Sequence, residues 1–127
     1  MYPADLKYDK EHEWVRVEGA EAVIGISDFA QDQLGEVVYV DLPSVGDELV
    51  AGETFGEIES VKSVSELYAP ITGTVLEVND ALGATPENIN SAPYGDGWMI
   101  KVSVADAAQL DALLSADEYE SFVANEG

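Results

Sequence analysis

Short stretches of alternating or β-branched residues recur from position 14 to position 104, a pattern typical of strands that bury one face. Residues 14–18 and 21–26 predict two strands, and Gly19-Ala20 between them predicts a tight hairpin. Residues 36–42 form the most β-prone stretch, which Pro43 ends. Further strands are predicted at 54–60, 64–69, 72–78 and 98–104, and a loop-rich region at 81–96.

One short helix interrupts the strands. Ser27 is a suitable N-cap for residues 28–34, and Gly35 stands where a left-handed C-cap residue is expected. The helical spacing would place Phe29 and Gln33 one turn apart.

The hydrophobic period changes near residue 106. One apolar stripe then follows helical spacing: Leu110, Leu113 and Leu114. Ser115 and Glu118 fit a capping box that would open a second helix. The pattern predicts a mainly β fold, a β-sandwich or flattened barrel, in one domain spanning 1–127 with a core at about 12–104 and C-terminal helices at about 105–125.

Charge and composition exclude several function classes. The chain has 26 acidic and 5 basic side chains in 127 residues, a formal charge of −21, which would repel nucleic acid and anionic membranes. It has no cysteine, so thiolate catalysis, disulfides and zinc–thiolate sites are absent. The single histidine, His12, cannot by itself form a metal site, and no serine-nucleophile motif accompanies it. No secretory signal and no membrane-spanning stretch are recognisable, so we expect a soluble, cytoplasmic protein. We also expect it to be a monomer.

Lys62 is the one basic residue between positions 17 and 100, where sixteen residues are acidic. It lies in the stretch EIESVKSVSE, between two predicted strands, at a turn that should project into solvent. Val-Lys is a poor turn sequence, because short hairpin turns favour Asn-Gly or Asp-Gly. A catalytic lysine would need a lowered pKa, whereas neighbouring acids favour the protonated amine; an attachment site needs only exposure and reach. Both readings, attachment site and plain surface lysine, stay open on these grounds.

Four segments resemble the glycine cleavage system H-protein family, in order and at its spacing. They are KEHEWVRVEG, AVIGISDFAQDQLGEVVYVDLPSVGD, GEIESVKSVSELYAPITGTVLEVN and NSAPYGDGWMIKV, and the resemblance covers about residues 6–123. It implies the lipoyl/biotinyl-type flattened barrel or sandwich and a carrier without enzymatic activity.

The resemblance implies lipoic acid attached to Lys62, which would give this cysteine-free chain its sulfur chemistry. A decarboxylase, the P protein, would load an aminomethyl group from glycine. An aminomethyltransferase, the T protein, would pass the methylene to tetrahydrofolate, and dihydrolipoyl dehydrogenase, the L protein, would reoxidise the dithiol. A lipoate ligase or lipoyltransferase would modify the lysine.

Four further residues receive roles from the resemblance. Glu13 and Glu66 would lie near a cleft that shelters the loaded arm. Glu59 and Gly73 would help the modifying ligase to recognise Lys62.

Three alternatives remain open at this point. The chain could relay lipoate to other enzymes. It could also be another lipoyl or biotinyl carrier domain, although its Val61-Lys62-Ser63 differs from the Met-Lys-Met that biotin carriers have at this turn and from the Asp-Lys-Ala of the lipoyl domains of 2-oxoacid dehydrogenases. From a different class, a small acidic hydrolase could use Glu57 and Glu59, which alternate onto one face of a predicted strand.

The acidic composition predicts that the stability of the protein depends on salt. A dense carboxylate surface is typical of halophilic proteins, such as those of a salt-loving archaeon, and we favour this over an acidic docking face because acids occur in every segment. Self-repulsion is screened over about 3 Å in molar salt but over about 30 Å at 0.01 M. We expect the protein to unfold in dilute buffer and to refold in molar KCl, followed by circular dichroism. Stability that does not change with salt would contradict the halophilic interpretation.

Overall fold

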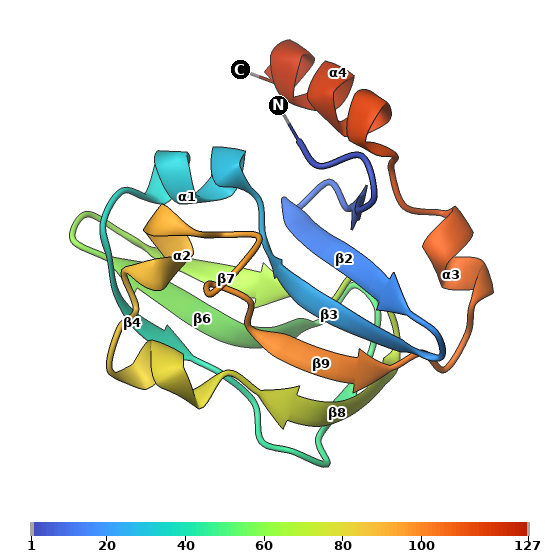
Figure 1. The fold of residues 1–127 in the computed structure, drawn as a ribbon. Helices are drawn as coiled ribbons and strands as arrows, with labels where there is room; N and C mark the ends of the chain where they lie inside the picture. Colours follow the sequence, from blue (N-terminus) through green and yellow to red (C-terminus); the bar gives the residue numbers. More distant parts are fainter. Residues whose placement is uncertain (1, 127) are drawn as a thin grey trace.

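The computed structural model describes residues 2–126 as two β-sheets with short helices and a longer C-terminal helix (Figure 1). The strands are β1 (Lys7–Tyr8), β2 (Glu13–Glu18), β3 (Glu21–Ile26), β4 (Val37–Asp41), β5 (Glu48–Leu49), β6 (Thr54–Ser60), β7 (Val64–Tyr68), β8 (Gly73–Val78) and β9 (Ile100–Ser103). The helices are α1 (Asp28–Leu34), the 3₁₀ helix η1 (Asp80–Gly83), α2 (Asn88–Ser91), α3 (Ala108–Asp111) and α4 (Ala116–Glu126). The predicted mainly β fold is confirmed.

All pairings between the strands are antiparallel. One sheet has six strands in the order β1-β2-β3-β9-β8-β5, and the other has three in the order β4-β6-β7. The central strand of the smaller sheet, β6, pairs with β4 on one side and with β7 on the other. The β6–β7 hairpin therefore has the sequence-predicted form, with its turn after Ser60.

The main core fills the space between the two sheets. It takes alternate residues from β2 and β3, such as Val15 and Ile24, and Ile58 and Leu67 from the smaller sheet, all at most 2% exposed. A second cluster lies on the other face of β2 and β3, where Trp14 and Val23 pack with Tyr8 and Tyr119. Both faces of the β2–β3 hairpin are thus buried, one under β6 and β7 and one under the C-terminal helix.

Helix α1 begins and ends at the residues that the sequence predicted. Ser27 has an extended backbone, and its Oγ accepts a hydrogen bond from the amide of Ala30 (3.2 Å), as an N-cap does. Gly35 has a φ of 81° but a ψ of −158°, so the predicted left-handed C-cap is wrong in detail. Essentially only glycine adopts this combination of φ and ψ, which explains why position 35 is a glycine.

The C-terminal part differs from the predicted helical stripe. Leu110 lies in the four-residue helix α3, whereas Leu113 and Leu114 follow it. Leu113 packs on the main core and Leu114 on the second cluster, where its backbone exchanges two hydrogen bonds with Tyr8. These long-range contacts, rather than a continued helix, account for the apolar spacing.

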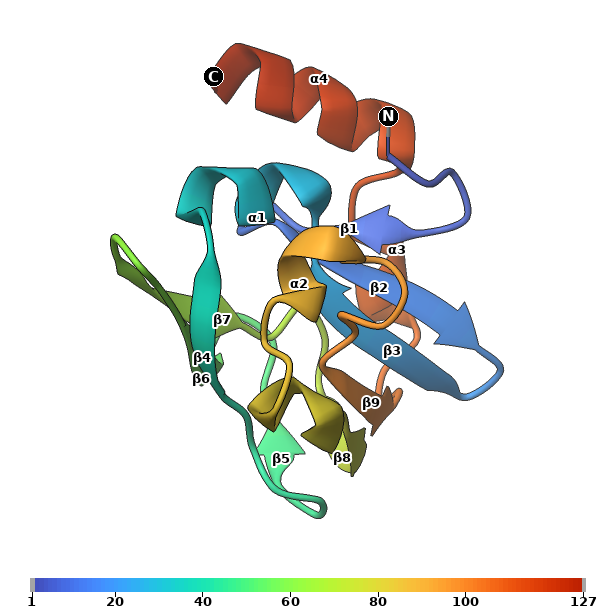
Figure 2. The same ribbon diagram turned by 60° about the vertical axis from the view of Figure 1, so that its left-hand side comes forward.

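The capping box predicted for α4 is present. The amide of Ser115 donates to Oε1 of Glu118 (2.9 Å), and the amide of Glu118 donates to Oγ of Ser115 (3.2 Å). Both views show α4 beside the N-terminal segment, near the open end of the β2–β3 hairpin and far from the turn that joins the two strands (Figures 1 and 2).

Some elements were not predicted. Strands β1 and β5 have two residues each, too few to show a period. The loop-rich region 81–96 contains most of η1 and all of α2. Within residues 2–126, no helix has the length and apolar character needed to cross a membrane.

Gly73 gives a test of strand packing. A Cβ atom on this buried residue would overlap the carbonyl oxygen of Ser103 in β9. We therefore expect Gly73→Ala to lower the free energy of unfolding by about 1–3 kcal/mol, measured by urea denaturation. Gly83→Ala is the matched control, since a Cβ there meets nothing within 4 Å. Equal stability of the two variants would contradict the packing.

Candidate functional site

Lys62 is exposed at the turn of the β6–β7 hairpin, as the sequence predicted. Ser60 stabilises this turn: its Oγ accepts hydrogen bonds from the amides of Ser63 (3.1 Å) and Lys62 (3.3 Å), and its amide donates to the carbonyl of Ser63 (2.8 Å). Among residues 2–126, only His12 is a non-glycine with positive φ, so Val61 and Lys62 bend the chain without the left-handed conformations that would require glycine. Serine hydrogen bonding thus compensates for the poor turn sequence.

The turn is also fixed to the neighbouring elements. The amide of Val61 donates to the carbonyl of Glu36, just before β4 (3.0 Å). The Cε atom of Lys62 lies 3.3 Å from the position that a Cβ on Gly35 would occupy. The aliphatic part of the lysine therefore runs past the end of α1, and glycine there leaves room for it.

The lysine amine has no partner of opposite charge among residues 2–126. Lys101 in β9 lies 3.5–3.6 Å from three carboxylates, those of Glu18, Glu21 and Glu77. No described residue makes such an ion pair with Lys62. Its amine is thus available for acylation without breaking an ion pair.

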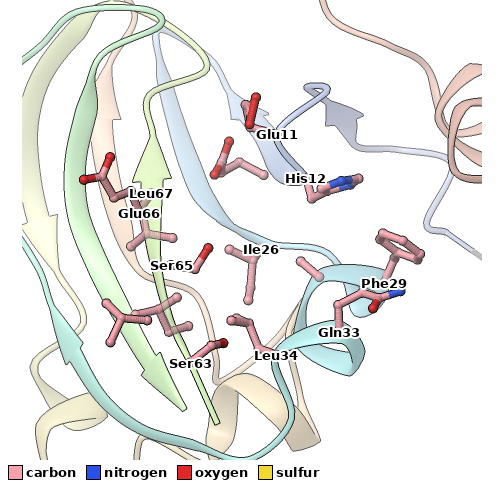
Figure 3. A pocket seen from close by; sticks show the side chains of 14 residues that line it. Glu11, His12, Ile26, Phe29, Gln33, Leu34, Ser63, Ser65, Glu66 and Leu67 are labelled. Carbon is pink, nitrogen blue, oxygen red and sulfur yellow. The ribbon is translucent and has the colours of Figure 1, made fainter. Parts of the chain in front are cut away.

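A cavity of about 530 Å³ lies beside this turn (Figure 3). Its walls are α1, strand β7 with the end of the turn, and the segment leading into β2. The lining residues are Glu11, His12, Glu13, Ile26, Phe29, Ala30, Gln33, Leu34, Ile58, Ser63, Val64, Ser65, Glu66 and Leu67. Phe29 and Gln33, predicted to lie one turn apart, both face it. The lining combines apolar side chains with acids at one end, which suits an apolar chain ending in a cation.

Glu13 is the buried acid of this cavity, with only 1% of its surface exposed. Its Oε2 accepts a hydrogen bond from the amide of Tyr68 in β7 (3.2 Å), while its Oε1 is buried without a donor. Asp9 lies next to it and accepts, through Oδ1, hydrogen bonds from the amides of Glu11 (3.1 Å) and Glu13 (2.9 Å). The carboxyl group of Glu13 thus lies next to a second carboxyl group, at a position where a buried carboxylate usually has a hydrogen-bond donor.

This environment favours the protonated acid. Burial, and then the adjacent Asp9, raise the pKa of Glu13 well above its usual value. Burial also raises the pKa of Asp9, although its hydrogen bonds act in the opposite direction. A proton shared between the two carboxyl groups would satisfy Oε1, and an arriving cation could replace it.

Glu66 lines the same cavity from β7 and is exposed. Its carboxylate accepts a hydrogen bond from the hydroxyl of Tyr68 (3.4 Å) and is directed away from α1 (Figure 3). The structure therefore brings Glu13, Glu66 and the Lys62 turn to one cavity, with Glu13 inside it and Glu66 at its rim.

The two residues expected to guide the ligase lie in different environments. Glu59 is exposed on β6, next to the residue that begins the turn, paired in register with Tyr39 and Val64. Gly73 is buried and lies so close to Ser103 that a side chain would not fit, which by itself accounts for a glycine at this position. A role for either residue in recognition stays a prediction.

Glu57 and Glu59, the carboxylates of the hydrolase alternative, are both exposed and do not line the cavity. Glu57 pairs in register with Asp41 and Glu66, so acids cluster on the outer face of the smaller sheet. No group of His, Asp or Glu side chains suited to a metal ion occurs among the described residues. This exposed surface offers no enclosed site for hydrolysis.

Sequence reasoning missed Ser60, Asp9 and the surroundings of His12. Ser60 and Asp9 act through short-range hydrogen bonds to backbone amides two to four residues away, and such spacing could have indicated them. His12 contacts Tyr119, 107 residues later, which no local pattern reveals.

Comparison with known proteins gives a consistent picture. The family model described as Glycine cleavage H-protein matches residues 6–126. A glycine cleavage system H protein of Carboxydothermus hydrogenoformans is 53% identical over 127 residues, covering 100% of this chain and 98% of that protein. One from Geobacillus kaustophilus is 57% identical over 125 residues, covering 98% of each. The crystal structure of a glycine cleavage system H protein from Mycobacterium marinum is similar, with a TM-score of 0.82 and 40% identity over 94% of this chain and 96% of that one.

The buried carboxyl group gives a pH-dependent prediction. Folding raises the pKa of Glu13, so protonated Glu13 contributes to the stability of the folded state. This contribution is complete below the pKa that Glu13 has in the unfolded chain, and it is lost as the pH rises through the pKa that Glu13 has in the folded chain. In Glu13→Gln, the amide nitrogen can donate to Asp9 and the amide oxygen can accept from Tyr68. We expect the variant to be more stable than wild type by about 1–3 kcal/mol at high pH, with the difference vanishing at low pH.

The measurement is urea denaturation of both proteins from pH 4 to pH 9. Glu11→Gln, an exposed acid of the same loop, is the control and should show no comparable change. A constant difference between Glu13→Gln and wild type across this range would refute the buried, protonated state.

Proposed function

Since the chain belongs to the glycine cleavage H-protein family, we propose that it is the lipoylated carrier of glycine cleavage, with the lipoyl group on Lys62. The observation that carries this proposal is the exposed lysine, which forms no ion pair with any described residue, on a hairpin turn beside an apolar cavity with a buried acid. Acylation would convert the charged amine to a neutral amide at the end of a long, mobile arm. When bound, the group would supply two sulfur atoms, one of which can carry the aminomethyl group after the disulfide has been reduced, and which together can hold two electrons as a dithiol.

The side chains would divide the remaining tasks. The hairpin holds the root of the arm in place, while solvent around the turn lets the arm reach partner active sites. Tethering keeps the cargo at high local concentration near whichever enzyme has docked. The residues of the chain make no bond to the substrate, so its role is that of a carrier and not of an enzyme.

The cavity would receive the loaded arm. Apolar residues such as Phe29 and Leu34 suit the hydrocarbon part, and Glu13 suits the terminal ammonium. Binding the amine in a site away from bulk water would protect the aminomethyl group from hydrolysis. Glu13 would give its proton to Asp9 or to solvent and would then pair with the cation as a carboxylate.

The partners follow from this role. They are the P protein, the T protein, the L protein and a lipoate ligase or lipoyltransferase, which would meet the chain at the face around Lys62. The exposure of Glu59 supports a role for this residue in contact with the ligase. A cytoplasmic location and a single domain with a helical C-terminal extension remain part of the proposal.

Reconstitution tests the proposed function. With the P, T and L proteins, glycine, tetrahydrofolate and NAD⁺, the lipoylated chain should support glycine decarboxylation, and Lys62→Arg should reduce turnover to background. Lys10→Arg changes another exposed lysine and should remain active. Full activity of Lys62→Arg would refute the proposal.

A further inference from the structure

We infer that Tyr119 of the C-terminal helix is a positioning residue that holds the two walls of the cavity together through its hydroxyl group. The inference rests on the proposed function and deepens it, by assigning to α4 a part in sheltering the loaded arm. Tyr119 itself does not line the cavity.

The hydroxyl of Tyr119 lies between side chains from both walls. It is 2.8 Å from Nδ1 of His12 and 2.6 Å from Oγ of Ser27. His12 directly precedes the buried Glu13 on one wall, whereas Ser27 caps α1, which forms the opposite wall. The two walls therefore meet at one phenolic oxygen.

Backbone hydrogen bonds tie the same residues together. The amide of Ser27 donates to the carbonyl of His12 (2.9 Å), and Oγ of Ser27 accepts from the amide of Ala30 (3.2 Å). A displacement of Tyr119 would thus be transmitted to the first turn of α1 and to the residue before Glu13.

His12 has the backbone conformation of a residue held in place by its surroundings. Its φ is 76°, a region that non-glycine residues enter at a cost of about 1 kcal/mol or more. Its ring contacts Phe29 of α1 (centroids 4.9 Å apart) and Phe122 of α4 (6.0 Å). The contacts with α1 and α4 stabilise this conformation, which sets the direction in which Glu13 enters the cavity.

Tyr119 is rigidly placed for this task. It is fully buried, and its ring stacks on that of Tyr8 with centroids 4.6 Å apart and planes 7° from parallel. Burial raises its pKa, so the hydroxyl keeps its proton over the physiological range. One proton and two oxygen lone pairs then satisfy the contacts with His12 and Ser27 together.

Tyr8 offers a matched control. It is as deeply buried as Tyr119 and belongs to the same stacked pair, but its hydroxyl donates to the carbonyl of Pro3 (2.9 Å) in the N-terminal segment. Tyr8→Phe therefore removes a comparable hydrogen bond without touching either wall of the cavity.

The first test uses the unmodified full-length chain and does not depend on the proposed function. In Tyr119→Phe, we expect the ¹⁵N shift of His12 Nδ1 to change and the amides of Ser27 and Ala30 to exchange with solvent about two- to tenfold faster. In Tyr8→Phe these signals should remain as in wild type. Unchanged His12 shifts and amide exchange in Tyr119→Phe would overturn the inference. If Tyr119→Phe does not fold, the wild-type protein decides: a through-space contact between the Tyr119 hydroxyl proton and His12 supports the inference, and its absence refutes it.

The second test uses the lipoylated protein loaded by the P protein with glycine and then isolated. Without the T protein, Tyr119→Phe should release ammonia about two- to tenfold faster than wild type, while Tyr8→Phe should match wild type. Equal release from Tyr119→Phe and wild type would refute the positioning role alone. A wild-type chain that cannot be loaded would instead refute the proposed function.

Discussion

The antiparallel pairing of β6 with both β4 and β7 is the constraint on which the site depends. It fixes the register of the hairpin, and the register places the turn after Ser60 so that Lys62 projects into solvent. Because a shift of one residue would exchange the two faces of β6, burial of Ile58 in the main core secures this register. The position of the turn thus derives from the core, and a group attached to Lys62 would be mobile because the lysine is exposed.

The cavity lies between α1, strand β7 of the smaller sheet and the segment that leads into β2. Strand β7 is an edge of its sheet, and the amide of Tyr68 on it reaches across to Glu13 at the start of β2. A buried carboxyl group costs free energy unless it is protonated or paired, so this position is unfavourable for the fold alone. Its Oε1 has no hydrogen-bond partner, and either a proton or an arriving cation would stabilise it.

Much of this could be predicted from the sequence, and the limits are physical. The hairpin, the N-cap at Ser27, the capping box at Ser115 and the exposure of Lys62 follow from local patterns that the structure reproduces. The burial of Glu13 does not, since KEHEW gives no sign that a later strand will cover it. The family resemblance pointed to Glu13, but its raised pKa arises from burial and from the neighbouring Asp9, which only the folded chain brings about.

The contact between Tyr119 and His12 could not be predicted from local sequence patterns either, because the two residues are 107 positions apart. The capping box at Ser115 predicted the start of α4 but not which polar groups the hydroxyl of Tyr119 would meet. Gly35 shows the same limit on a smaller scale: glycine at the helix end was expected, but its ψ depends on how α1 joins β4.

The central claim is that Lys62 is a covalent anchor for a lipoyl group. It is tested most directly by peptide mass spectrometry of the protein purified from its own cells. The account predicts a lipoyl adduct on the peptide that contains Lys62 and unmodified lysine at positions 7, 10 and 101. A biotinyl adduct, a lipoyl group on another lysine, or an unmodified Lys62 in cells that carry out glycine cleavage would contradict it.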